Sequence, residues 1–120
     1  MDRQQIGRAA EDAAVQFLES RGLAILLRNY RRRLGELDII ARERDILVIA
    51  EVRTRASAAY GGAAATVGRS KQRRIIRATA QLLQQRRELA GLRIRFDVLV
   101  VRGPAAKQPQ VEWIQHAFAA

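Results

Sequence analysis

The stretch that most restricts the fold of this chain is residues 35–55, GELDIIARERDILVIAEVRTR. Two largely apolar runs, 35–42 and 46–54, lie on either side of a polar turn at Arg44 and Asp45. Runs of this length around a short polar turn are typical of a β-hairpin. Both runs nevertheless contain charged residues. Because an unpaired buried charge is costly, these charges need a structural or a functional explanation.

Closing the hairpin symmetrically about its turn determines which charged residues meet. Asp38 then faces Glu51, and Glu36 faces Arg53, all on one side of the sheet because strand side chains alternate. The other side is apolar and pairs Leu37 with Val52, Ile39 with Ala50, and Ala41 with Val48. Two directly opposed carboxylates destabilise each other unless they are neutralised. A proton or a nearby arginine would neutralise them, and so would a divalent cation held between Asp38 and Glu51.

The rest of the chain alternates between helical and strand patterns. The sequence predicts helices at 4–21 and 71–90, and strands at 24–30, 35–42, 46–54, 94–101 and, at an edge, 110–114. Ser70 is the expected N-cap of the second helix, and residues 56–69 are a small-residue loop expected to be mobile or ligand-facing. The order of elements predicts a single α/β domain over residues 1–120, with a mixed sheet and helices packed on it.

Composition excludes several kinds of site. The chain has no cysteine, which excludes disulfides, thiolate metal sites and cysteine nucleophiles, and its one histidine, His116, argues against a Ser-His triad. A metal would therefore be held by oxygen atoms, which favours Mg²⁺ or Mn²⁺. No apolar run is long enough to span a membrane, and the N-terminus has no secretory pattern. We expect a cytoplasmic protein without a membrane partner.

The charge points to a polyanionic partner. The chain has 22 Lys and Arg against 12 Asp and Glu, a net charge of +10. Nucleic acid is the partner that such a charge most favours, while a solvated arginine-rich surface is the alternative. The candidate contacts are Arg31, Arg32, Arg33, Arg55, Lys71, Gln72 and Arg73. For Gln72, a hydrogen bond to the backbone explains its place on an apolar stripe equally well.

Glu11 is a candidate third carboxylate. It lies at the border of the apolar stripe of the first helix, so a helix packed on the sheet would bring it to the sheet edge. A solvated helix residue is the other interpretation of Glu11.

The pattern of a helical Glu followed by "D…EV(K)" across a hairpin resembles the core of PD-(D/E)XK nucleases. More specifically, the chain resembles the YraN family of small bacterial proteins, through GRAAEDAAVQFLESRGLAIL, GELDIIA, VIAEVRTR, KQRRIIRATAQLL and RFDVLV. The resemblance implies a restriction-endonuclease-like fold, shared with archaeal Holliday-junction resolvases, which cut branched DNA with a metal and usually act as dimers. It further implies Glu11, Asp38 and Glu51 as ligands of Mg²⁺ or Mn²⁺.

Arg53 departs from the motif, which has lysine at this position. Arginine stays protonated and cannot act as a base, although it can stabilise developing negative charge. The arginine is then a harmless replacement, or the mark of a degenerate site, or a sign that the role of the lysine has moved to Lys71. We therefore expect a nuclease-like DNA-binding protein, a metal-dependent endonuclease acting on branched or single-stranded DNA. A non-catalytic nucleic-acid-binding protein is the alternative.

Overall fold

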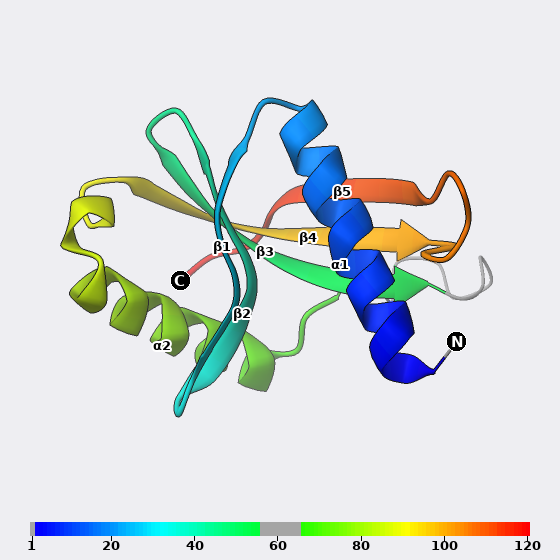
Figure 1. The fold of residues 1–120 in the computed structure, drawn as a ribbon. Helices are drawn as coiled ribbons and strands as arrows, with labels where there is room; N and C mark the ends of the chain where they lie inside the picture. Colours follow the sequence, from blue (N-terminus) through cyan, green and yellow to red (C-terminus); the bar gives the residue numbers. More distant parts are fainter. Residues whose placement is uncertain (1, 56–65) are drawn as a thin grey trace.

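In residues 2–55 and 66–120, which this computed structural model describes, five strands form one mixed sheet with a helix on each face (Figure 1). The elements are α1 (Arg3–Ser20), β1 (Ala24–Arg32), β2 (Gly35–Glu43), β3 (Ile46–Arg55), α2 (Arg69–Gln85), the 3₁₀ helix η2 (Arg87–Leu89), β4 (Arg93–Arg102) and β5 (Gln110–Phe118). The strand order is β1-β2-β3-β4-β5, with β3 and β4 parallel and the other neighbours antiparallel. This is the expected α/β architecture, consistent with a restriction-endonuclease-like fold.

The core has one layer on each face of the sheet. The layer under α1 contains Ala10, Ala14 and Leu18 of the helix with Ile39, Ala41, Val48, Ala50, Leu99 and Val101 of the sheet. The layer under α2 contains Ile75, Ala78 and Leu82 of the helix with Leu37, Ile40, Ile49, Val98 and Val100 of the sheet. Alternate residues of the central strands thus point to opposite helices. Because both faces are covered, these strands read as nearly continuous apolar runs.

The second helix differs from its prediction at both ends. Its N-cap is Gly68, which has extended backbone and whose carbonyl accepts a hydrogen bond from the N–H of Gln72 at 2.9 Å. Ser70 lies inside the first turn, so its prediction as N-cap was wrong; the helix begins before it because Gly68 takes the capping conformation. α2 ends at Gln85, and η2 occupies part of the remaining predicted range.

The last strand is longer than predicted, because it continues pairing with β4 as far as Phe118. Phe118 pairs with Phe96, and the two rings stack with their centroids 4.9 Å apart. Residues 56–65 of the predicted loop lie outside the described residues. Within the described ranges, no helix is long and apolar enough to cross a membrane.

The predicted register of the central hairpin is confirmed where β2 and β3 pair. Ile39 pairs with Ala50, and the same register continues to the turn. The regular pairing ends at Ile39, and beyond it the side chain of Asp38 accepts a hydrogen bond from the N–H of Val52 at 2.9 Å. Simple alternation therefore fails here. The prediction that Leu37 shares a face with Ile39 was wrong, because Leu37 packs under α2.

Glu36 also departs from its predicted pairing with Arg53. It pairs across the β1–β2 hairpin with Arg31, and Arg31 Nε lies 3.5 Å from Glu36 Oε2. The physical reason is the order of the sheet. β2 lies between β1 and β3, and at this end its regular pairing is with β1 alone.

The tip of the β1–β2 hairpin packs directly against α2 at Gly35. A Cβ atom at this position would lie 2.6 Å from the carbonyl oxygen of Arg74, closer than such atoms approach. Gly35→Ala should therefore lower the free energy of unfolding by about 1–3 kcal/mol, the usual cost of overpacking. Urea denaturation measures it. The matched control is Gly91→Ala, where the added methyl meets nothing within 4 Å. Equal effects of the two substitutions would contradict the close contact.

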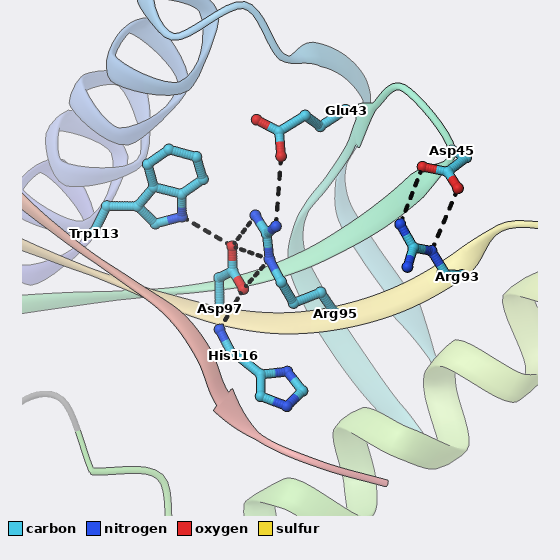
Figure 2. A network of polar contacts seen from close by, with 7 residues as sticks. All are labelled: Glu43, Asp45, Arg93, Arg95, Asp97, Trp113 and His116. Carbon is cyan, nitrogen blue, oxygen red and sulfur yellow. Dashed lines mark hydrogen bonds and ion pairs between the residues drawn. The ribbon is translucent and has the colours of Figure 1, made fainter.

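Asp97 is a buried residue of β4, and its side chain contacts two residues of the neighbouring strand β5 (Figure 2). Its carboxylate accepts hydrogen bonds from Arg95 Nε at 2.9 Å, from the indole Nε1 of Trp113 at 2.9 Å and from the backbone N–H of His116 at 2.9 Å. His116 has a φ of 55°, an uncommon backbone conformation. The ion pair of Asp97 with Arg95 and its hydrogen bond with Trp113 give these three residues a structural role.

Candidate active site at the open end of β2 and β3

A polar cavity lies where α1 passes the ends of β1, β2 and β3 that are far from the β2–β3 turn. Its lining includes Gln4, Arg8, Glu11, Asn29, Arg31, Glu36, Asp38, Val52 and Arg53. The structure thus brings Glu11, Asp38 and Arg53, three of the predicted site residues, to one cavity. β2 and β3 no longer pair regularly here, which leaves room between their side chains.

Glu51, which precedes the cavity-lining Val52 on β3, is buried and contacts Lys71 of α2. Its side chain is 7% exposed, and its Oε1 lies 3.1 Å from Lys71 Nζ. Burial, together with the charge of Asp38 and a hydrogen bond with it, raises the pKa of Glu51 to about 8, although Lys71 acts in the opposite direction. The opposed carboxylates expected from the hairpin register are therefore close enough for Asp38 to raise the pKa of Glu51. The predicted proton is consistent with this raised pKa, and the cation that contacts Glu51 is Lys71 instead of the predicted arginine.

Two carboxylates that repel each other are also suited to a divalent cation. A cation between Asp38 and Glu51 would replace the proton that Glu51 holds at neutral pH, and an all-oxygen donor set fits Mg²⁺ or Mn²⁺. Among the residues that the structure describes, no group of three His, Cys, Asp or Glu side chains is gathered closely enough to hold a metal. The remaining ligands of the metal would then be water or phosphate oxygens. Glu11 could be a further ligand if it gave up its hydrogen bonds with β1.

Glu11 reaches the cavity but is held by β1. Its Oε1 accepts hydrogen bonds from Arg28 Nε and Asn29 Nδ2, each at 2.9 Å, and its side chain is 12% exposed. Arg28 also donates to Asp12 at 2.7 Å. Sequence analysis missed Arg28 and Asn29. The signal that could have indicated them was a pair of polar residues inside an apolar strand. Asparagine also tolerates a positive φ, such as the 53° found at Asn29.

Arg53 lies two residues after Glu51 on β3 and lines the cavity. Its Nε atom is buried and has no hydrogen-bond partner among the residues that the structure describes. Buried donors are rarely left without an acceptor, so this atom is suited to an anionic oxygen or a water entering the cavity. A guanidinium at this position can hold a phosphate oxygen, whereas it cannot remove a proton.

Of the predicted nucleic-acid contacts, some side chains are exposed and others form contacts within the protein. Arg31 and Arg33 are exposed at the hairpin, and Arg73 is exposed on α2. Arg32 forms a cation–π contact, with its guanidinium carbon 4.2 Å from the centre of the Tyr30 ring. Gln72 donates a hydrogen bond from Nε2 to the carbonyl of Val67 at 2.7 Å, which favours its structural interpretation. The half-buried Arg55 ends β3, away from the hairpin.

Comparison with known proteins identifies the family. Residues 10–101 match the uncharacterised protein family UPF0102. UPF0102 proteins of Saccharophagus degradans and Desulfosudis oleivorans are 45% and 42% identical to this chain over 95% and 98% of its length, covering 92% and 93% of their own. The UPF0102 protein lpg2994 of Legionella pneumophila is 38% identical over 98% of this chain and 97% of its own. The protein is a member of UPF0102. The resemblance to the YraN family is thereby confirmed, because YraN belongs to UPF0102.

The arrangement of cations in this UPF0102 protein bears on the missing motif lysine. Lys71 comes from α2, far from β3 in sequence, yet its amino group contacts Glu51. Arg53 occupies the motif position on β3 and faces the same cavity as Asp38. The site thus combines a lysine and an arginine where the motif has a lysine alone. The migration of the lysine's role to Lys71 stays a prediction, and the contact with Glu51 is the arrangement that it requires.

Metal binding by this UPF0102 protein can be tested by thermal stability. Added Mn²⁺ should raise the melting temperature of the wild type by roughly 5 °C or more at saturation, because a cation bound to the folded state alone stabilises it. Asp38→Asn should remove most of this shift. The control is Asp45→Asn, which changes an exposed acidic residue at the β2–β3 turn. An equal shift in Asp38→Asn and the wild type would show that Mn²⁺ binds elsewhere.

Proposed function

We propose that this UPF0102 protein binds DNA and cleaves its phosphodiester bonds with Mg²⁺ or Mn²⁺ held by Asp38 and Glu51. The observation that carries the proposal is the buried Glu51, whose pKa is raised by burial and by nearby Asp38, and whose carboxylate contacts Lys71. Buried carboxylates with shifted pKa values next to a cation are a frequent feature of catalytic sites. The net charge of +10 supplies the attraction for a polyanion.

Each side chain has a distinct role in this proposal. A bound divalent cation supplies polarisation of the phosphoryl group and lowers the pKa of a coordinated water. Lys71 Nζ, which lies against Glu51, holds and orients the attacking water. Arg53 donates to a phosphoryl oxygen through its unpartnered Nε and stabilises the negative charge that develops there. Glu11 would supply a further oxygen ligand for the metal in place of its hydrogen bonds with Arg28 and Asn29. A homodimer, implied by the resemblance to resolvases, is part of the proposal and can be tested by sedimentation.

Cleavage of labelled linear, flapped and four-way-junction DNA in Mn²⁺ tests the proposal. Glu51→Gln and Lys71→Met should each lose at least about 100-fold in rate, since they remove a metal ligand and the group that orients water. Lys107→Met is the matched control for Lys71→Met, because Lys107 is the other lysine of the chain and is exposed in the β4–β5 connection. Cleavage that persists unchanged in Glu51→Gln would come from a contaminant or another site, and would contradict the assignment of Glu51 to the active site.

A second function is favoured by Arg53 itself. A site whose motif lysine has become arginine fits a protein that binds nucleic acid without cutting it. In that case the wild type binds DNA with an affinity that falls steeply as salt rises, but does not cleave it. Cleavage that appears only in Arg53→Lys would support this second function over the first. Salt-independent binding would count against both.

A further inference from the structure

The turn between β1 and β2 exposes a large apolar side chain. Arg32 pairs with Gly35, so Arg33 and Leu34 form the turn itself. Leu34 is 49% exposed, and in the described part of the chain Ile94, at 37%, is the other large hydrophobic side chain that is comparably exposed. Nothing in the packing of the sheet needs a leucine at this tip, and a polar turn residue would be the usual choice.

The tip is held rigidly in place. Gly35 lies against the carbonyl of Arg74 on α2, and Figure 1 shows the hairpin tip beside the first turns of that helix. Just before the tip, Arg32 stacks on Tyr30 and donates from Nη2 to Gln85 Oε1 at 3.3 Å. Tyr30 donates its hydroxyl to the same oxygen at 2.6 Å. These contacts fix the direction in which Leu34 projects, which a flexible loop would not do.

Several cationic side chains lie beside the tip. A cleft between the hairpin and α2 is lined by Arg31, Arg32, Arg33, Leu34, Glu36, Lys71 and Arg74. Arg33 and Arg74 are exposed, and neither forms an ion pair with a described residue. Arg31 and Glu36 line both this cleft and the cavity that contains Asp38, and Lys71 connects the cleft to Glu51. The cleft and the candidate active site therefore form one continuous surface.

We infer that the β1–β2 tip is a wedge that places Leu34 against base faces in DNA whose stacking is interrupted, while Arg33 and Arg74 hold the adjacent phosphates. The inference rests on the proposed DNA binding and extends it to a substrate class. In a continuous duplex, insertion of an apolar side chain must first unstack a base step, whereas at a branch point that step is already disrupted. The wedge thus favours branched over linear DNA without reading sequence.

The test uses 2-aminopurine, which becomes brighter when unstacked, at the branch of a four-way junction and at the matching position of a linear duplex. Binding is measured in EDTA, so that cleavage does not intervene. The wild type should bind the junction more tightly and brighten the probe there. Leu34→Ser should weaken junction binding about tenfold, change duplex binding less than about twofold and abolish the brightening, because the wedge acts where stacking is broken. Ile94→Ser is the control, because Ile94 on β4 is the other exposed large apolar side chain of the described residues, and it should behave as the wild type.

The outcomes separate this inference from the proposed function. If Leu34→Ser, with an unchanged melting temperature, keeps the junction preference and the brightening, there is no wedge, while DNA binding stands. If the wild type binds neither DNA, both proposals fail, and Leu34 would instead belong to a protein contact. If Leu34→Ser weakens duplex and junction equally, the tip is a general DNA contact and the branch selectivity is wrong.

Discussion

Glu51→Gln is expected to make the protein more stable at pH 8.5, by about 2–4 kcal/mol, while leaving its stability at pH 4 nearly unchanged. The side chain of Glu51 is buried, and its pKa is raised from 4.5 to about 8, first by burial and then by Asp38. Between these two values the folded state keeps a proton that the unfolded state has released. Unfolding therefore releases protons, and stability falls as the pH rises from about 4.5 to about 8. Glutamine keeps the size and hydrogen bonding of the protonated acid and has no such loss.

Urea denaturation of the wild type and Glu51→Gln at several pH values measures this effect. The difference between the two should grow across the window from about 4.5 to about 8 and then level off. Glu19→Gln, an exposed position at the end of α1, is the control and should follow the wild type. Parallel pH profiles of wild type and Glu51→Gln would mean that the ion pair with Lys71 outweighs burial and keeps Glu51 ionised. The variant would then be less stable at neutral pH.

The same change should have opposite effects on stability and on function. A buried acid that costs stability at neutral pH is retained where a ligand makes use of its charge, as at many catalytic sites. If Mn²⁺ binds Asp38 and Glu51, the wild type should regain stability in Mn²⁺ at pH 8.5 and Glu51→Gln should not. Stabilisation in both would show that the cation does not use Glu51.

Asp97→Ala is expected to destabilise the protein by about 3–5 kcal/mol, because it leaves a largely buried cation without its main partner. Arg95 is 14% exposed and Asp97 is 0% exposed, so water cannot replace the lost carboxylate easily. Figure 2 shows that the same carboxylate also accepts from Trp113 and from the backbone of His116. These two donors lose their acceptor as well, and each buried unsatisfied donor costs about 1–3 kcal/mol.

The matched control is the exposed ion pair between Asp45 and Arg93. Asp45→Ala removes another Arg–Asp pair, with Arg93, but both side chains are more than two-thirds exposed, at 74% and 68% (Figure 2). Its effect should be within about 1 kcal/mol, as for other surface ion pairs. Chemical denaturation measures both variants, and hydrogen exchange should show loss of protection in β5 for Asp97→Ala. Similar effects of the two substitutions would mean that Glu43, 3.4 Å from Arg95, takes over the role of Asp97.

Local patterns predicted most of the elements of this fold. Apolar runs and turn residues located the helices and strands, and symmetry about the β2–β3 turn gave the observed register of Ile39 with Ala50. The helix ends were less predictable. Gly68 rather than Ser70 begins α2, since the choice depends on the backbone conformation that the preceding chain imposes. β5 is extended by the stacking of Phe118 on Phe96, a contact between residues far apart in sequence.

The sequence by itself determined the β2–β3 hairpin, and with it the proximity of Asp38 and Glu51, because the residues that carry this pairing are close along the chain. Only the tertiary structure decided which groups surround them. Lys71 reaches Glu51 because α2 packs across the sheet, and Glu11 is held by Arg28 and Asn29 because α1 lies against β1. Such contacts depend on packing angles and burial, which pattern and spacing do not specify.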